Sequence, residues 1–323
     1  QDGFIWQRDD GSGLRIRAQP FRFISGIAGD AYTGLWWIER PNIVAGTWEL
    51  WNWNPATQQI VRAFAGNADV FSSASPLVSA TLAPILLAVR QIEPGDGSAV
   101  SLFLDTSDSL TQRLNGGLFR LALRIPPDAP STLDGAPRLV LAPGAYQSPL
   151  AVSPDNTRLA FSVYDADQPS LTAGQIRPPN RIKLLTLEGR GSSTIRTIYQ
   201  TETRLEFIAP LLTWQDNETL LTARARFAAT GTIGLDLFGA VWLQLPTGDA
   251  ALSPSAISVR VPANQRLLDL TGCRDDQSAL LVLLDSDGSL GYARWSTIEA
   301  PTRTFTVPNN LTRAFICWRN LAP

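Results

Sequence analysis

The sequence predicts an all-β fold built from repeated antiparallel sheets. Apolar and polar residues alternate with the two-residue period of strands, and turns rich in Gly, Pro, Asn and Asp separate these stretches. No stretch of a dozen residues has the period of an amphipathic helix. With 323 residues, of which 44% are hydrophobic, the chain can bury a large core, and we expect a single domain over residues 1–323.

The clearest repeat runs from Ser148 to Tyr199 and contains four strands, here called a to d. Strand a ends at a Ser-Pro-Asp-Asn turn that closes at Asn156, and strand b follows over 157–162. Strand c is predicted over 181–187 and strand d over 193–199. Weaker copies of this plan occur at 210–223, 267–284 and 314–320.

The Ser-Pro-Asp-Asn stretch, followed by the apolar strand b, resembles the repeats of TolB-type β-propellers. In that pattern a short strand, a Ser-Pro-Asp-Gly turn and an apolar strand follow one another, and Asn156 stands here where Gly is usual. Asn tolerates a left-handed turn position. The resemblance implies a propeller built from four-stranded blades and a role in binding a protein partner.

Six c–d hairpins can be counted independently of that resemblance. Their turns lie near Asp9, Asn54, Pro126, Glu188, Pro246 and Ser296. We therefore predict a six-bladed β-propeller whose ring is closed by joining an N-terminal c–d hairpin (Phe4–Ala18) with a C-terminal a strand (Ala314–Trp318). A two-sheet sandwich, or two smaller β domains, is the alternative.

Charge and composition exclude several functional classes. The net charge of −2 argues against a strongly basic nucleic-acid-binding protein. Because there is no histidine, a Ser-His-Asp triad and histidine metal ligands are impossible. We expect neither a cofactor nor a resident metal. The best apolar run, Pro76–Val89, is 14 residues long, against the roughly 20 that a spanning helix needs.

Four turn acids recur at one position of the repeat: Asp155, Asp216, Asp275 and Asp276. Such recurrence could build a cation site, but Asp in tight turns also accepts hydrogen bonds from backbone N–H groups, and we favour that role. The Asp285–Gly288 stretch is similarly interpreted as a β-turn, because a calcium loop would continue to a distant Glu.

Ten tryptophans are present, and five of them lie between Trp36 and Trp53. Trp51 and Trp53 are two residues apart and so share one face of a strand. An aromatic binding surface is one interpretation. Packing between adjacent sheets is the one we favour.

Two cysteines, Cys273 and Cys317, fall on a strands of neighbouring repeats. The register places them on facing sides of adjacent blades, which makes a disulfide geometrically plausible. Two buried free thiols are the equally weighted alternative.

The loops suggest where a partner binds. The a–b turns are tight, whereas long b–c connections are predicted at Arg40–Thr47, Gln91–Gly116, Asp165–Asn180 and Arg224–Gly239. Long ordered loops in compact domains are usually functional. The apolar residues proposed to contact the partner are Ile43, Val44, Phe103, Leu110, Leu171, Ile176, Leu235, Leu237 and Phe238.

We therefore expect a non-enzymatic binding or scaffolding protein of the bacterial cell envelope or an extracellular assembly. The absence of Met at position 1 suggests a processed N-terminus, which would fit the periplasm or the cell surface. One alternative is a lactonase- or lyase-type enzyme with a metal held by Asp, Glu and Asn. Another is a ligand-sensing ectodomain of a larger receptor.

Overall fold

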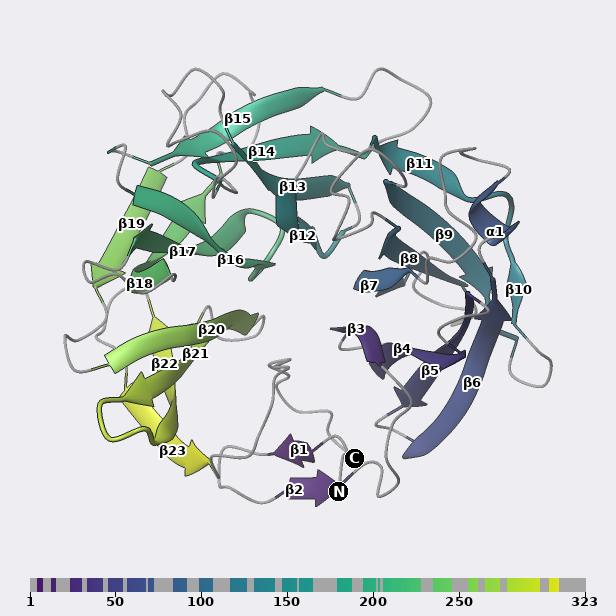
Figure 1. Ribbon diagram of the computed structural model, residues 1–323, viewed down its shortest axis with the longest axis horizontal. Helices are drawn as coiled ribbons and strands as arrows, with labels where there is room; N and C mark the ends of the chain where they lie inside the picture. Colours follow the sequence, from purple (N-terminus) through teal and green to yellow (C-terminus); the bar gives the residue numbers. More distant parts are fainter. Residues whose placement is uncertain are drawn as a thin grey trace. The chain divides into compact units, whose positions relative to one another are not determined.

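The computed structural model describes most of the strands and their tight turns (Figure 1). The described residues are 5–7, 13–15, 24–30, 34–42, 46–54, 57–67, 69–72, 84–91, 99–106, 117–126, 131–142, 147–155, 157–164, 179–187, 194–201, 203, 206–227, 235–245, 255–260, 265–273, 278–296 and 302–307. The chain divides into two compact units: Gln1–Tyr146 with Asn320–Pro323 (unit 1), and Gln147–Arg319 (unit 2).

Unit 1 contains two larger antiparallel sheets and one hairpin. The first sheet has the order β3 (Ile24–Asp30), β4 (Gly34–Asn42), β5 (Thr47–Asn54), β6 (Gln59–Gly66). The second contains β7 (Ile85–Gln91), β8 (Ala99–Asp105) and β9 (Leu118–Arg124), with β10 (Thr132–Leu133) and β11 (Arg138–Leu141) both paired to β9. The hairpin joins β1 (Ile5–Gln7) to β2 (Gly13–Arg15), and the short helix α1 spans Asp69–Ser72. Strands β3 and β7 lie side by side.

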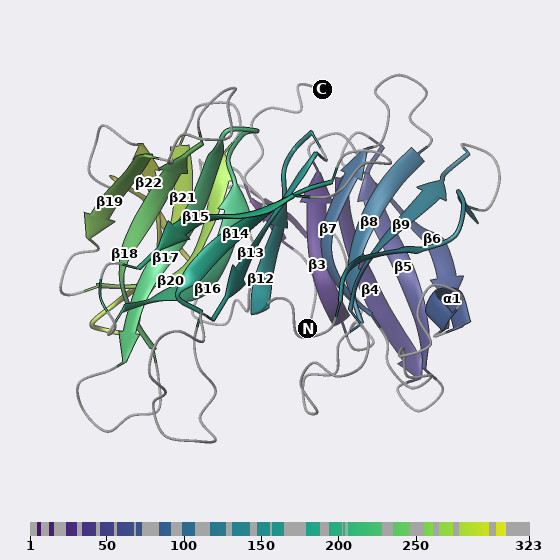
Figure 2. The same cartoon turned by 90° about the horizontal axis from the view of Figure 1, so that it is seen from above.

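Unit 2 consists of three consecutive four-stranded antiparallel sheets. They are β12 (Gln147–Val152), β13 (Arg158–Val163), β14 (Arg181–Thr186), β15 (Ile195–Gln200); β16 (Glu206–Trp214), β17 (Thr219–Phe227), β18 (Leu235–Gln244), β19 (Ser255–Arg260); and β20 (Gln265–Cys273), β21 (Ser278–Asp285), β22 (Leu290–Ser296), β23 (Thr302–Val307). The first strand of each sheet contacts the first strand of the next, β12 with β16 and β16 with β20. Figure 2 shows the strands of these sheets lying along roughly the same line within the unit, with neighbouring strands antiparallel.

This arrangement is all-β and propeller-like, because consecutive four-stranded meanders meet along their first strands. The predicted repeat at Ser148–Tyr199 is confirmed as the sheet β12–β15. Each of the six predicted c–d turns joins an antiparallel pair. Residues 314–318 lie outside the described residues, so closure of a six-bladed ring stays a prediction, as does a single domain over the whole chain.

Apolar side chains fill the space between neighbouring sheets within each unit. In unit 1 one cluster includes Trp36 and Trp48 from the β3–β6 sheet, and Leu102 and Phe119 from the β7–β11 sheet, with Phe71 of α1. In unit 2 one cluster joins the β12–β15 and β16–β19 sheets, and another joins the β16–β19 and β20–β23 sheets. The alternation of buried residues along each strand supplies these faces.

The first strand of each of the five larger sheets carries a register shift. The shifts lie between Ile24 and Ile27, Leu86 and Ala88, Gln147 and Leu150, Ile208 and Leu212, and Leu267 and Asp269. A bulge leaves residues without a ladder partner, and proline is tolerated there because it has no N–H to donate. This explains why Pro149 and Pro210 occur inside strands.

Three predicted loops are partly wrong. Residues 99–105, expected within the loop Gln91–Gly116, form β8, because Val100, Leu102 and Leu104 alternate into the core of unit 1. The expected loop Arg224–Gly239 shortens to 228–234, since β17 continues to Phe227 and β18 begins at Leu235.

The loop expected at Arg40–Thr47 shortens to 43–46, because β4 continues to Asn42. The connection expected at Asp165–Asn180 agrees with the strand ends at Val163 and Arg181. Within the described part of the chain, no helix is long and apolar enough to cross a membrane.

Candidate functional site

The b–c and d–a connections of the β12–β15 sheet meet at a polar cluster between the first two sheets of unit 2. In an antiparallel four-stranded meander these two connections lie at the same end of the sheet. We call this cluster the unit 2 junction. It consists of Pro179, Asn180, Thr201, Thr203, Glu206 and Arg224.

Backbone hydrogen bonds fix the chain at the unit 2 junction. The Asn180 N–H donates to the Val163 carbonyl at 3.1 Å, and the Thr201 N–H donates to the Asn180 carbonyl at 3.1 Å. The Ile208 N–H donates to the Pro179 carbonyl at 2.7 Å, which ties the β16 strand to the preceding sheet. Asn180 and Thr201 are buried, so these bonds are shielded from water.

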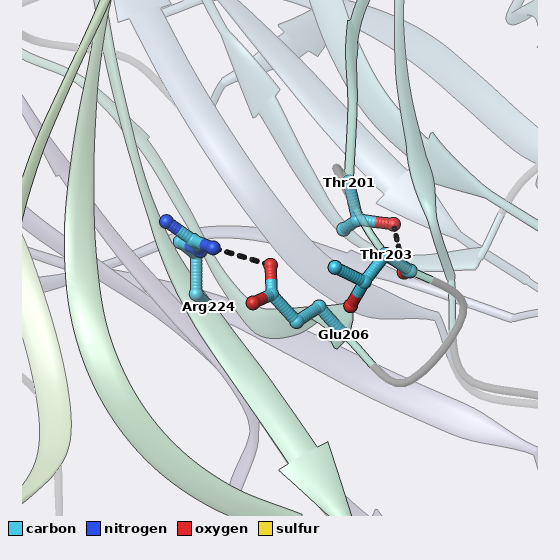
Figure 3. A network of polar contacts seen from close by, with 4 residues as sticks. All are labelled: Thr201, Thr203, Glu206 and Arg224. Atoms are coloured by element: carbon cyan, nitrogen blue, oxygen red, sulfur yellow. Dashed lines mark hydrogen bonds and ion pairs between the residues drawn. The ribbon is translucent and has the colours of Figure 1, made fainter.

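An ion pair completes the junction (Figure 3). Glu206 at the start of β16 accepts a hydrogen bond from Nη2 of Arg224 near the end of β17. The two side chains are only 18% and 14% exposed, so the pair is far less screened by water than a surface pair. Beside it, the Thr201 hydroxyl donates to the Thr203 carbonyl at 3.4 Å.

At the opposite end of these sheets, the turn acids close their own turns. The Asp155 carboxylate accepts from the Ser153 hydroxyl at 2.6 Å and from the Thr157 N–H at 3.1 Å. The Asp216 carboxylate accepts from the Glu218 and Thr219 N–H groups at 2.7 and 2.6 Å. The turn role is therefore confirmed for Asp155 and Asp216. Asp275 and Asp276 lie outside the described residues.

Burial would by itself raise the pKa of Asp155, but its hydrogen bonds and a nearby charge outweigh that effect. The donors Ser153 and Thr157, with the positive charge of Arg158, hold the pKa of Asp155 below its usual range. No group of three or more Asp, Glu, Cys or His side chains suited to a metal ion occurs within the described ranges.

The two neighbouring a–b turns are linked to each other. The Asp155 N–H donates to the Asn217 side-chain oxygen at 3.0 Å. The Trp214 indole N–H donates to the Ala151 carbonyl at 2.9 Å, and the Arg158 guanidinium carbon lies 6.0 Å from the centre of the Trp214 ring. The first two sheets of unit 2 are therefore joined by polar contacts at both ends.

The predicted β-turn at Asp285–Gly288 is confirmed. The Gly288 N–H donates to the Asp285 carbonyl at 3.0 Å, and the Ser289 N–H donates to the Asp287 carboxylate at 2.8 Å. Gly288 has a φ of +83°, a conformation that favours glycine at this position.

Packing between adjacent sheets is confirmed for Trp36 and Trp48, which belong to the core cluster that joins the β3–β6 and β7–β11 sheets. Trp36, Trp37, Trp48 and Trp53 are buried. Trp51 is half-buried and stacks on Trp37, with ring centroids 6.4 Å apart and an interplanar angle of 11°. The indole N–H of Trp37 donates to buried Glu39 at 2.9 Å.

Four of the nine predicted partner-binding residues lie among the described residues, and all four are in strands. The predicted contact of Phe103 with a partner is wrong. Phe103 lies in β8 and is fully buried, so its ring cannot contact a partner. Leu235, Leu237 and Phe238 lie in strand β18 and not in a loop. The remaining predicted contacts lie outside the described residues: Ile43, Val44, Leu110, Leu171 and Ile176.

The cysteine prediction stays untested. Cys273 is the last residue of β20, whereas Cys317 lies outside the described residues. The residues of the unit 2 junction were not predicted. No local motif marks Glu206 and Arg224, because they are 18 residues apart and meet only when β16 pairs with β17.

No protein-family model matches this sequence, and no curated protein matches it either. Solved structures with a distant overall similarity include TolB from Acinetobacter baumannii, at 13% identity and a TM-score of 0.39, covering 86% of this chain and 56% of TolB. A prolyl endopeptidase shares 11% identity with a TM-score of 0.44, covering 94% of this chain and 39% of the enzyme.

Dipeptidyl peptidase 4 from Porphyromonas gingivalis shares 10% identity with a TM-score of 0.42, covering 86% of this chain and 39% of the peptidase. This chain thus spans well under two thirds of the length of these three proteins.

Proposed function

We propose that this chain is a non-enzymatic, propeller-like scaffold that binds a protein partner outside the bacterial cytoplasm. The partner docks on the end of unit 2 where the b–c connections emerge. The observation that carries the proposal is the anchoring of the longest of these connections, residues 164–180, at the unit 2 junction.

The anchoring supports a binding role because it presents a long segment from a rigid base. Asn180 and Pro179 hold the C-terminal end of the connection through backbone bonds to β13 and β16. The Glu206–Arg224 pair then stiffens the neighbouring strand. Binding residues are often carried on loops positioned by a rigid framework, and this connection is much longer than the 228–234 and 286–289 connections of the same unit.

A matched pair of deletions tests the proposal. Removing Pro169–Gln175 shortens the b–c connection and leaves the anchor at Pro179 and Asn180 intact. Removing Thr247–Ser253 shortens the c–d connection between β18 and β19 by the same length at the other end of the sheet. The measurement is affinity for the protein that co-purifies with the native chain, with circular dichroism to verify folding.

We expect the 169–175 deletion to weaken partner binding and the 247–253 deletion to leave it unchanged. The proposal is wrong if both variants bind the partner equally well. Loss of folding in the 169–175 variant alone would show that this segment covers the core and is not a docking loop.

Metal analysis addresses the enzymatic alternative. A stoichiometric divalent ion in the purified native protein, together with hydrolysis of a lactone or cleavage of a sugar polymer, would replace the scaffold proposal with a lactonase- or lyase-type function.

A further inference from the structure

One face of the β7–β11 sheet carries two arginines in direct opposition. Arg120 of β9 and Arg138 of β11 are cross-strand partners. The neighbours Phe119 and Leu121 point into the core of unit 1, so Arg120 lies on the other face of the sheet. Directly opposed side chains have Cβ atoms about 4.5–5.5 Å apart, which brings the two positive charges close together.

Within the described part of the chain, a hydroxyl and an aromatic ring hold Arg120 in place. Its Nε donates to the hydroxyl of buried Ser101 at 2.6 Å, and its guanidinium carbon lies 5.9 Å from the centre of the buried Phe103 ring. Among the described residues, no acidic side chain pairs with Arg120 or Arg138. The anchor at Nε orients the terminal nitrogens of Arg120, for which no acceptor occurs among the described residues.

The next arginine on the same face of β9 gives a contrast. Arg124 has a carboxylate partner, Asp134, at 3.3 Å. Arg120 instead has Arg138 opposite it, and like charges in that position destabilise a sheet. Burial lowers the pKa of Arg120, and the charge of Arg138 lowers it further. A bound anion would remove this electrostatic cost.

We propose that Arg120 and Arg138 form a binding site for a tetrahedral oxyanion, a free phosphate or sulfate. Guanidinium groups donate pairs of parallel hydrogen bonds that match the spacing of phosphate oxygens, and two of them can hold one dianion from two sides. Ser101 positions Arg120, and Arg138 supplies the second charge. The site is independent of the partner-docking function proposed above.

Calorimetric titration of the full chain with inorganic phosphate and with sulfate, in chloride buffer of constant ionic strength, tests this site. The informative variants are Arg138→Gln, which removes the second charge, and Arg120→Lys, which keeps the charge and removes the planar fork. Arg124→Gln is the matched control, because it makes the same charge change as Arg138→Gln on the same sheet at an arginine that already has a carboxylate.

We expect one phosphate to bind the wild-type chain, and each of the two informative variants to bind it at least about tenfold more weakly. The control variant should bind as the wild type does. In chloride alone, Arg138→Gln should unfold at a temperature no lower than the wild type, because it relieves repulsion. If Arg120→Lys does not fold, the comparison of phosphate binding by Arg138→Gln and Arg124→Gln still tests the proposed site.

Three results would overturn the proposal. The first is no measurable binding of phosphate or sulfate to the wild type. The second is equal binding by Arg138→Gln and Arg124→Gln, which would indicate general charge screening. The third is tighter binding of acetate than of phosphate, which would indicate a site for carboxylates.

Discussion

Single side chains close the a–b turns of unit 2. Asp155 and Asp216 each accept two hydrogen bonds from groups within three residues of themselves. Their carboxylates therefore satisfy donors that the turn would otherwise leave unpaired. The recurrence of acids at this position of the repeat follows from turn chemistry.

The lowered pKa of Asp155 predicts a pH-dependent contribution to stability. A carboxylate whose pKa is lower in the folded than in the unfolded chain stabilises the fold above the unfolded pKa of about 3.9, and this contribution is lost as the pH falls through the folded pKa. Urea unfolding of the wild type and Asp155→Asn should differ most at neutral pH and converge in acid. Ser153→Ala, which removes one donor, should show a smaller pH dependence than the wild type. Parallel pH curves for the wild type and Asp155→Asn would contradict this account.

Gly26 sets how closely β3 approaches β7. Its φ is +89°, and a Cβ built on it would lie 2.3 Å from the Leu86 carbonyl oxygen and 2.5 Å from the Leu86 nitrogen. Because these are backbone atoms, no side-chain movement can relieve the overlap. We expect Gly26→Ala to reduce the free energy of unfolding by about 2–4 kcal/mol.

Gly135→Ala is the control for Gly26→Ala. Gly135 has nearly the same φ, +91°, but nothing lies within 4 Å of its Cβ position. Gly135→Ala should therefore reduce the free energy of unfolding only by the backbone strain, about 1–2 kcal/mol. Equal losses for the two variants in urea unfolding would show that the approach of β3 to β7 is not tightly packed.

At the scale of elements, the first strand of each larger sheet performs two tasks. It pairs with the second strand, and it contacts the first strand of a neighbouring sheet in the same unit. The bulge on each of these strands interrupts pairing where the backbone must bend, as β-bulges do elsewhere. In β16 the segment before the bulge is also held by Glu206, through its bond to Arg224 on β17.

The Glu206–Arg224 pair should contribute more than a surface pair. We expect a double-mutant cycle with Glu206→Gln and Arg224→Gln to give a coupling energy of about 1–3 kcal/mol, because the two side chains are only 18% and 14% exposed and their attraction is weakly screened by water. The same cycle at Arg124 and Asp134, which are 68% and 42% exposed, should give less than about 1 kcal/mol. Urea unfolding measures both cycles. If the coupling energy of the Glu206–Arg224 pair is no larger than that of the Arg124–Asp134 pair, the Glu206–Arg224 pair does not act as an anchor.

At the scale of the whole molecule, the two units share one construction plan. Each stacks antiparallel sheets through their first strands, and each buries apolar faces between neighbouring sheets. The β1–β2 hairpin of unit 1 is the sheet with the fewest strands among the described residues. The predicted ring closure would extend that hairpin with Ala314–Trp318.

Truncation tests this closure. If residues 314–318 complete the β1–β2 sheet, a chain ending at Val307 should exchange its backbone amides faster at Ile5–Gln7 and Gly13–Arg15, because the hairpin loses the strand that extends its sheet. Exchange in the β12–β15 sheet should stay unchanged and serves as the internal reference. Hydrogen exchange read by mass spectrometry makes the comparison. Unchanged exchange in β1 and β2 would contradict the closure.

Local patterns in the sequence determined the strands, the six c–d hairpins, the Asp turns and the packing role of the tryptophans. Each of these depends on residues close together in the chain: alternation along a strand, or a side chain bonding to a backbone group two or three residues away. Even the apolar alternation that makes residues 99–105 a strand was present, although it was assigned to a loop.

The tertiary structure alone decided which distant side chains meet. Glu206 meets Arg224 diagonally across the β16–β17 pair, since its direct partner is Arg226, and Arg120 lies directly opposite Arg138; strand register alone produces both meetings. Register is a property of two strands together, and a shift of one residue would send each of these side chains to the other face of its sheet. The burial of Phe103 likewise could not be predicted from the sequence, because whether an apolar ring is buried or exposed depends on the chain that packs against it.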